Sequence, residues 1–142
     1  MTDLLVNIDV DDLDRAIAFY SQAFGLTAGR RFGAGGVEML GLSAPIYLLV
    51  KPAGSVAAST ASQRRDYARH WTPVHLDFVV ADIRAAVARA EAAGAALEAP
   101  LKSRAWGHLA LMADPFGNGF CLVEFLGRGY DEIAEPPRQP SG

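Results

Sequence analysis

The chain has few of the features that mark secreted and membrane proteins. Its 142 residues include a single cysteine, Cys121, so an internal disulfide is excluded and a reducing compartment is favoured. No apolar stretch approaches the roughly 20 residues that span a bilayer, and the first residues lack the positive charge and apolar core of a signal peptide. We therefore expect a cytoplasmic protein without a membrane partner.

The chain also lacks an excess of basic charge. The formal net charge is −3, and Lys and Arg do not gather in a dense run. The electrostatic attraction to phosphate backbones is therefore missing, and we expect no nucleic-acid partner. The glycine cluster at residues 33–36 lacks the Lys-Ser/Thr pair that completes a phosphate-binding loop, so it predicts a hairpin turn.

What remains is the composition of a folded domain. Hydrophobic residues make up 51% of the chain and charged residues 20%, which is the balance of an ordinary globular protein. A chain of 142 residues fits one compact domain and is long enough to bury a substantial core.

A short segment recurs about halfway along the chain. Residues 10–18 align with residues 80–88, with four identical positions, and Asp12 matches Asp82 at an offset of 82 − 12 = 70 residues. In both copies an apolar strand-like run precedes the Asp and a helix-like pattern follows it. The sequence thus indicates two copies of one unit, with a site where the copies meet.

The first copy predicts a β-α-β-β-β unit. Residues 4–10 alternate and place Leu5, Asn7 and Asp9 on the face opposite the core. Asp11 or Asp12 is suited to cap the helix that follows, and Gly25 is suited to end it. Glycines separate the later strands. The helix and these strands are predicted over residues 13–24, 27–32, 37–42 and 46–50.

The second copy repeats this plan. Residues 74–80 form its first predicted strand, with His75 and Asp77 on one face. Asp82 is the helix cap, and Asp114-Pro115-Phe116-Gly117 matches a type I turn and predicts a hairpin. The remaining elements are predicted as a helix over residues 83–93 and strands around Leu97, over 106–113 and over 120–126.

Two segments fall outside the repeated plan. Residues 51–71 form a long connection that carries Arg64, Arg65 and Arg69, and a connection of this length suits a lid over a pocket. Its arginines suit either an anionic ligand or a solvated face. The end of the chain, residues 136–142, is too proline-rich and polar to pack and is expected to fray.

Three features of the sequence carry a resemblance to a known family. They are Asp12-Leu13 leading through a helix to Phe19-Tyr20, His75 with Asp82 seven residues later, and Gly107 leading into Asp114-Pro115-Phe116-Gly117-Asn118. Over residues 4–126 the chain resembles the glyoxalase, bleomycin-resistance and extradiol-dioxygenase group, the vicinal oxygen chelate family. The resemblance implies an α+β fold in which two βαβββ modules form a cupped mixed sheet. It also implies a homodimer whose cups combine or adjoin modules of both chains.

The resemblance and the repeat together set the expected boundaries. We expect a single domain followed by a short C-terminal tail, and we divide the domain into two modules joined by the long connection. The boundaries are 1–128 for the domain, about 3–51 for module one, 52–72 for the connection, 73–128 for module two and 129–142 for the tail.

The resemblance also implies where a metal would bind. Metal-dependent members place one ligand on the first strand and one on the last strand of each module. The matching positions are Leu5 and Tyr47 in module one and His75 and Cys121 in module two. Only His75 is a conventional ligand, whereas catalytic metal sites typically supply about three. Glu124 lies three residues beyond Cys121, but strand alternation points it at the opposite face. We therefore expect no metal and no other cofactor.

The candidate site residues are the polar and aromatic side chains expected around the cup. For ligand binding they are Leu5, Asn7, Asp9, Tyr47, Trp71, His75, Trp106, His108 and Cys121. Each is also compatible with ordinary packing or with a solvent-facing position, and Cys121 suits an inert buried thiol. His75 and Asp77 are in addition the candidate catalytic pair, because a histidine beside a carboxylate can act as a general base.

Three functions are compatible with this pattern. The first is a metal-independent protein that binds a small apolar or aromatic molecule in its cup. The second is an enzyme of the same family, a lyase, isomerase or dioxygenase, with a displaced metal or a His75 and Asp77 acid-base pair. The third is a structural dimer whose cup is vestigial.

Overall fold

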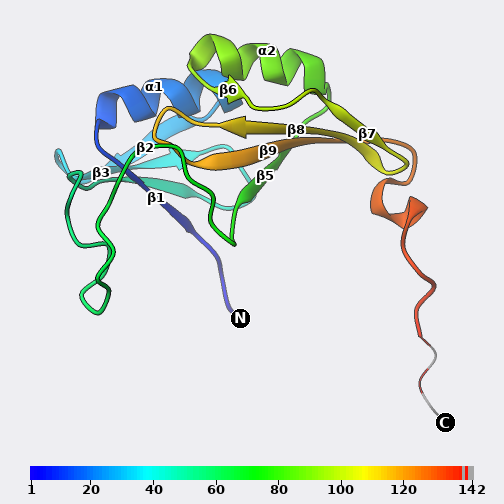
Figure 1. Ribbon diagram of the computed structural model, residues 1–142, viewed down its shortest axis with the longest axis horizontal. Coiled ribbons are helices and arrows are strands. Elements are labelled where there is room, and N and C mark those ends of the chain that lie inside the picture. Colours follow the sequence, from blue (N-terminus) through cyan, green and yellow to red (C-terminus); the bar gives the residue numbers. More distant parts are fainter. Residues whose placement is uncertain (139, 141–142) are drawn as a thin grey trace.

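The chain folds into two modules of the same plan, joined by a long connection (Figure 1). This computed structural model describes residues 1–138 and 140, so the expected fraying of the tail falls partly outside the described residues. Module one contains β1 (Val6–Val10), α1 (Leu13–Phe24), β2 (Thr27–Arg31), β3 (Gly36–Leu40) and β4 (Ile46–Val50). Module two contains β5 (Leu76–Val79), α2 (Ile83–Ala93), β6 (Ala96–Leu97), β7 (Lys102–Arg104), β8 (Gly107–Ala113) and β9 (Gly119–Phe125).

Each module forms its own mixed sheet. The strand order is β1-β4-β3-β2 in module one and β5-β9-β8-β6 in module two, where β7 also pairs with β8. The first and last strands of each module pair in parallel, and the register places Asn7 opposite Tyr47 and Asp77 opposite Cys121. The predicted α+β fold of two repeated modules is therefore confirmed, and the repeat extends to the residue pairs on these strands.

Both helices begin and end as the sequence predicts. Asp12 accepts a hydrogen bond from the backbone N–H of Arg15, and Asp82 accepts one from Ala85, each at 3.1 Å. These contacts satisfy backbone donors that the first helical turn leaves free. Gly25 ends α1 with a φ of 68°, a left-handed conformation that glycine adopts without steric cost.

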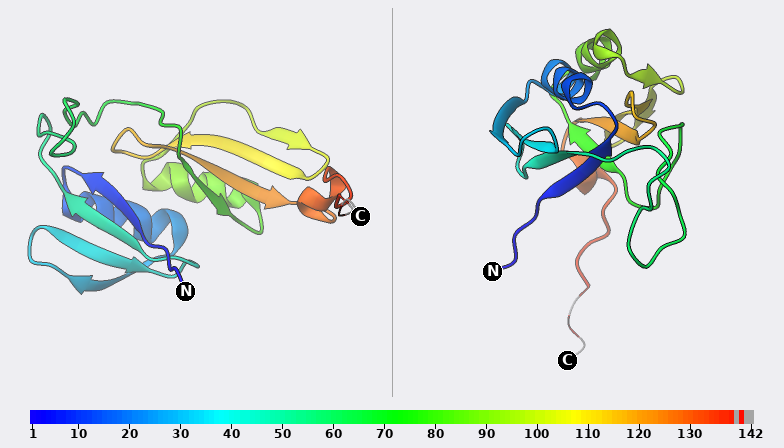
Figure 2. Two further views of the ribbon diagram at one scale, coloured as in Figure 1. Left: turned by 90° about the horizontal axis from the view of Figure 1, so that it is seen from below. Right: turned by 90° about the vertical axis from the view of Figure 1, so that its left-hand side faces the viewer.

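The helices cover one face of the two sheets and leave the other face open. Seen from below in Figure 2, the modules lie side by side with α1 and α2 behind the strands. The modules share an aromatic core: the Phe24 and Phe78 rings stack with centroids 4.0 Å apart, and Phe19 meets Phe120 edge to face at 6.4 Å. Since α1 supplies one partner of each pair and module two the other, these contacts hold the modules together.

A buried hydrogen bond also joins the modules. The hydroxyl of Tyr20 on α1 donates to the Asp114 carboxylate at 2.7 Å. Burial, and then the charge of Asp114, raise the pKa of Tyr20 well above its usual value, so the hydroxyl keeps its proton. Asp114 also accepts from the backbone N–H groups of Phe116 and Asn118, as expected for the predicted turn.

The differences from the predicted elements are small and local. Most strands are one or two residues shorter than predicted, and β7 is additional because Lys102–Arg104 shows no apolar alternation. Gly129–Glu132 forms a 3-10 helix in the region predicted as tail, where Tyr130 packs against Trp106 and Phe125. None of the helices within the described residues has the length and hydropathy needed to cross a membrane.

Candidate functional site

Three predicted site residues meet on the open face of module two. His75 directly precedes β5, Asp77 lies on β5, and Cys121 lies on β9 directly opposite Asp77. The His75 Nε2 atom is 3.2 Å from Asp77 Oδ1, and both side chains are 40% exposed. Nitrogen, oxygen and sulfur donor atoms of the three residues lie within 4.8 Å of one another. We refer to His75, Asp77 and Cys121 as the His-Asp-Cys cluster.

The thiol in this cluster is not activated by its surroundings. Burial, and then the neighbouring Asp77 carboxylate, raise the pKa of Cys121 to about 11. The side chain is protonated near neutral pH, whereas a nucleophilic cysteine needs its thiolate form. With no cation bound, Cys121 is therefore a protonated thiol of low reactivity.

The end of the connection packs against His75. The ring of Trp71 meets the His75 imidazole edge to face, with centroids 5.6 Å apart. The guanidinium of Arg69 lies 4.5 Å from the centre of the Trp71 ring and forms an ion pair with Glu98. Gly119 leaves room for this ring, since a Cβ there would lie 2.8 Å from Trp71 atoms. The connection thus limits the positions that the imidazole can take.

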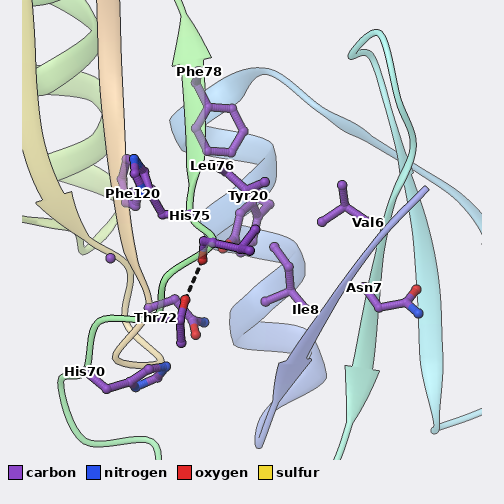
Figure 3. A pocket seen from close by; sticks show the side chains of 13 residues that line it. Val6, Asn7, Ile8, Tyr20, His70, Thr72, His75, Leu76, Phe78 and Phe120 are labelled. Atoms are coloured by element: carbon purple, nitrogen blue, oxygen red, sulfur yellow. Dashed lines mark hydrogen bonds between the residues drawn. The ribbon is translucent and has the colours of Figure 1, made fainter. Parts of the chain in front are cut away.

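A cavity of about 210 Å³ lies where the modules meet, between β1 and β5 (Figure 3). Its walls are mainly apolar, with Val6 and Ile8 on β1 and Leu76 and Phe78 on β5. Figure 3 shows these side chains around a space that α1 closes with Tyr20. Polar groups also reach this cavity, from Asn7, His70, Thr72, His75 and Asn118.

A larger hollow of about 800 Å³ adjoins this cavity beneath the connection. Asn7, His70, Thr72 and Asn118 line both spaces. The connection is held over the hollow by an ion pair between Arg65 and Asp9 at 2.7 Å. The backbone N–H of His70 also donates to Gly117 at 2.9 Å. The predicted site residue Asp9 therefore anchors the connection.

The arginines of the connection differ in what they contact. Arg65 bonds Asp9 and the backbone carbonyls of Val56 and Ala57, and Arg69 is held by Glu98. Arg64 lines the larger hollow with Lys51, and its guanidinium donates to the Gly54 carbonyl. Arg65 and Arg69 thus have structural roles, while Arg64 and Lys51 bring positive charge to the hollow.

The open face of module one carries a separate polar network. Arg30 donates to both carboxylate oxygens of Glu38, at 3.2 and 2.7 Å, and Tyr47 donates to Glu38 at 2.9 Å. Hydrogen bonds from the Arg30 side chain and backbone, then from Tyr47, hold the pKa of Glu38 at about 2. These residues and Leu5 line a cavity of about 350 Å³. Arg30 and Glu38 were not predicted site residues.

Two other predicted residues lie away from these cavities. Trp106 packs against Phe125 and Tyr130 at the far end of module two. His108 contacts Ser103 at 2.9 Å, and its Nε2 lies 3.9 Å from Glu124. Glu124 accepts from the backbone N–H of Ile83 at 2.9 Å, at the start of α2. Glu124 therefore faces the helix, as strand alternation predicts.

The donors present do not fit a metal shared between the two modules. In module one, Leu5 offers no ligand atom, and the Tyr47 hydroxyl is bonded to both Arg30 and Glu38. The Glu38 carboxylate beside them is already neutralised by Arg30. In module two, by contrast, the His-Asp-Cys cluster supplies three different ligand atoms. Counting ligand positions strand by strand overlooked Asp77, which joins the cluster through its pairing with Cys121.

Comparisons with known proteins agree with this architecture. Solved structures of the same fold include the fosfomycin resistance protein FosX from Listeria monocytogenes, with a TM-score of 0.69, 17% identity and coverage of 94% of this chain and 99% of that chain. A glyoxalase/bleomycin resistance protein/dioxygenase family enzyme from Burkholderia phytofirmans PsJN has a TM-score of 0.66, 21% identity and coverage of 88% and 100%. A lactoylglutathione lyase from Agrobacterium tumefaciens has a TM-score of 0.60, 21% identity and coverage of 87% and 94%.

The family is identified by its sequence model. No curated protein matches the chain. The model of the glyoxalase-like domain matches residues 5–123, which include both modules and the connection between them. The chain therefore belongs to the glyoxalase-like domain family, within the vicinal oxygen chelate group.

Proposed function

We propose that this protein binds a small organic molecule with an apolar or aromatic body between its two modules. The observation that carries the proposal is the pair of adjoining hollows, of about 210 and 800 Å³, that share four lining residues. Ligand pockets commonly measure about 300 to 1,000 Å³ and combine apolar walls with a few polar groups.

The lining indicates how such a ligand would lie. The smaller cavity is walled by the apolar side chains of Val6, Ile8, Leu76 and Phe78, which suit an apolar body. The larger hollow carries Lys51 and Arg64, which suit a polar or anionic group. A molecule with an aromatic body and an anionic group therefore matches both spaces.

Binding of this kind does not need a metal shared by the modules. Contacts with the apolar walls and with Lys51 and Arg64 supply the affinity. Metal independence of ligand binding is thus part of the proposal. A cytoplasmic location is also part of it, because Cys121 is free and suits a reducing compartment.

The probe for testing this proposal is 1-anilinonaphthalene-8-sulfonate, which has an aromatic body and one sulfonate. Metal-free protein is expected to bind it saturably at one molecule per chain, with a rise in melting temperature by mass action. Thr72 lines both hollows, so Thr72→Trp is expected to fill the entrance and abolish the fluorescence enhancement.

A matched control is available in module one. Thr27 is exposed at the start of β2 and lines neither hollow, so Thr27→Trp is expected to bind the probe like the wild type. Absence of saturable binding to the folded wild-type protein, or equal binding by the Thr72→Trp variant, would contradict the proposal.

A second candidate function is catalysis by His75 and Asp77. Their 3.2 Å contact is the specific observation in its favour, because a carboxylate beside an imidazole holds the ring in a fixed orientation for proton transfer. A screen against the lyase, isomerase and ring-cleaving reactions of the family is the test. His75→Ala is expected to abolish any turnover found, while His108→Ala leaves it unchanged. Normal turnover by the folded His75→Ala variant would exclude this candidate.

A further inference from the structure

We propose that the junction between the two hollows selects ligands that carry a primary ammonium group. His70, Thr72 and Asn118 line both the smaller cavity and the larger hollow, and we call these three residues the junction acceptors. Bonds within the protein hold a donor of each one, whereas an acceptor atom of each has no partner within the described residues. The inference deepens the ligand-binding proposal and rests on it.

The tautomer of His70 follows from its contact with the backbone. Its Nδ1 lies 2.9 Å from the carbonyl oxygen of Ala68. Because a carbonyl oxygen only accepts, Nδ1 carries the proton of the neutral ring, and Nε2 is then an acceptor without a hydrogen. Nε2 has no hydrogen-bond partner in the part of the chain that the structure describes. His70 therefore offers an acceptor to the junction.

The hydroxyl hydrogen of Thr72 is also bonded within the protein. It is donated to the carbonyl oxygen of Val74, as the dashed line in Figure 3 marks. A hydroxyl has one hydrogen and two acceptor lone pairs, so with this bond in place the oxygen can only accept from a ligand. Figure 3 shows the side chains of Thr72 and His70 at the same end of the smaller cavity. The connection thus brings two acceptors to this end.

Asn118 adds a third acceptor from the turn between β8 and β9. Its amide nitrogen donates to the Asp114 carboxylate at 2.9 Å. Since a carboxylate only accepts, this bond determines which end of the amide is the nitrogen. The amide oxygen is on the other branch of the side chain. His70 and Asn118 form a parallel β-bridge, which keeps their acceptors close to each other.

The charge around the junction also suits a cation. The smaller cavity is lined by no Lys or Arg within the described residues. The Asp114 carboxylate lies behind Asn118 and Tyr20, which both line this cavity and donate to it. An ammonium group has three donors and no acceptor, which matches the three junction acceptors. Asn7, the fourth residue that lines both spaces, can donate as well as accept and leaves this preference unchanged.

The ammonium group gives the proposed ligand a third point of recognition. The apolar or aromatic body lies in the smaller cavity, and the anionic group lies toward Lys51 and Arg64 in the larger hollow. The ammonium group then lies between them, at the residues that both spaces share. The ligand class is therefore an aromatic or apolar amine that also carries an anionic group.

The test compares two probes that differ only in the amino group. L-Phenylalanine and hydrocinnamate share a phenyl ring and a carboxylate, and only the first carries an ammonium group at neutral pH. Each is titrated into metal-free protein that holds 1-anilinonaphthalene-8-sulfonate, and the loss of fluorescence gives its affinity. L-Phenylalanine is expected to bind at least about 10-fold more tightly, a factor that corresponds to about 1.4 kcal/mol and that one hydrogen bond to a charged group can supply.

Two variants each remove one junction acceptor. Thr72→Val removes the hydroxyl and keeps the shape of the side chain, and His70→Leu removes the imidazole. Each is expected to reduce the preference for L-phenylalanine at least about 3-fold, with little change in the affinity for hydrocinnamate. Thr27→Val is the matched control, at an exposed position that lines neither hollow, and is expected to keep the wild-type preference. Melting curves show whether each variant is folded.

The outcomes separate this inference from the proposal on which it rests. If the fluorescent probe binds but hydrocinnamate displaces it as well as L-phenylalanine does, the inference is overturned and ligand binding stands. Displacement by neither compound, or an unchanged preference in both folded variants, overturns the inference in the same way. If the fluorescent probe does not bind the folded wild-type protein, both the inference and the ligand-binding proposal are overturned.

Discussion

The hydroxyl group of Tyr20 links one module to the other. It donates to Asp114, whose carboxylate also accepts two backbone N–H groups and the side-chain amide of Asn118. Both Tyr20 and Asp114 are at least 95% buried, with 3% and 5% of their surface exposed. A buried carboxylate needs all of these donors, because burial without them is costly.

Tyr20→Phe removes one donor and leaves the ring in place. We expect the free energy of unfolding to fall by about 1.5 to 3 kcal/mol, the range for hydrogen bonds to charged groups. Urea denaturation measures this loss. Tyr130→Phe, at a side chain that is 51% exposed, is the control and is expected to change little. Equal midpoints for wild type and Tyr20→Phe would refute the role of this hydrogen bond.

Glu38 gives the stability of the protein a dependence on acid pH. Its pKa is lowered from 4.5 to about 2 by hydrogen bonds from Arg30 and Tyr47. Between these values the unfolded chain binds a proton that the folded chain does not, so stability falls as the pH falls. The contribution of Glu38 is complete above pH 4.5 and is lost toward pH 2.

Glu38→Gln is therefore expected to flatten the acid part of the stability curve. Urea unfolding at several pH values below 4.5 compares the variant with wild type. Glu91→Gln, at an exposed position on α2, is expected to keep the wild-type slope. If Glu38→Gln also keeps that slope, the low pKa of Glu38 does not contribute to stability.

At the scale of elements, the connection depends on the turn between β8 and β9. Gly117 has a φ of +82°, and a Cβ there would lie 2.3 Å from the carbonyl oxygen of Ala68. The backbone N–H of His70 donates to the Gly117 carbonyl at 2.9 Å. The turn thus serves both as a hairpin and as the surface on which the connection rests.

Gly117→Ala is expected to loosen the connection and the hairpin together. The left-handed φ costs about 1 to 2 kcal/mol for a residue with a Cβ, and the clash with Ala68 adds to this. A lower melting temperature and faster proteolysis within residues 51–71 are the expected readouts. Gly35→Ala has its nearest contact at 3.5 Å and no positive φ, so it is the control. Resistance of Gly117→Ala to proteolysis equal to wild type would argue against this role.

The ends of the helices could be predicted from the sequence, whereas the set of residues that meet at the candidate site could be predicted only in part. The cap at Asp82 and the helix end at Gly25 depend on neighbours within a few residues, and both were predicted. The first cap was predicted as Asp11 or Asp12, and it is Asp12. The shared face of His75 and Asp77 follows from strand alternation. That Cys121 lies opposite Asp77 depends on the register of β5 with β9, two strands far apart in the chain.

In module one, too, the contact between two site residues depends on strand register and could not be predicted from the sequence. Arg30 reaches Glu38 across an irregular pairing of β2 with β3, where the register shifts between Ala28 and Arg31. Such a bulge changes which side chains share a face. A single glutamate within an apolar strand was a signal that this position has a partner, but the partner's identity depends on the bulge.

At the scale of the whole molecule, the open face of the sheets leaves apolar side chains in solvent. Leu5 is 51% exposed and Val79 is 64% exposed, and neither helix lies on that side (Figure 2). A second copy of the chain would cover this surface. We propose a homodimer in which the second chain covers Leu5 and Val79 and leaves His75 and Asp77 accessible.

Light scattering tests this proposal. Wild-type protein is expected at twice the monomer mass of 15.1 kDa, and Val79→Lys is expected to shift it to the monomer because a lysine on the covered face would be desolvated. Val56→Lys is the matched control on the connection, where the valine is 43% exposed. A monomeric wild type, or a dimeric Val79→Lys variant, would refute the proposal.

The parallel pairing of first and last strands determines the order in which this chain can fold. β1 has its partner only after β4 has been made, and β5 has its partner only after β9. The first and last strands of each module must therefore come together before its sheet is complete. Closing the chain between them has an entropic cost, which slows folding. On the ribosome, module one has all of its strands before β5 emerges. The contacts of Phe24 with Phe78 and of Tyr20 with Asp114 join the two halves, and they can form only after β5 and the turn between β8 and β9 have been made.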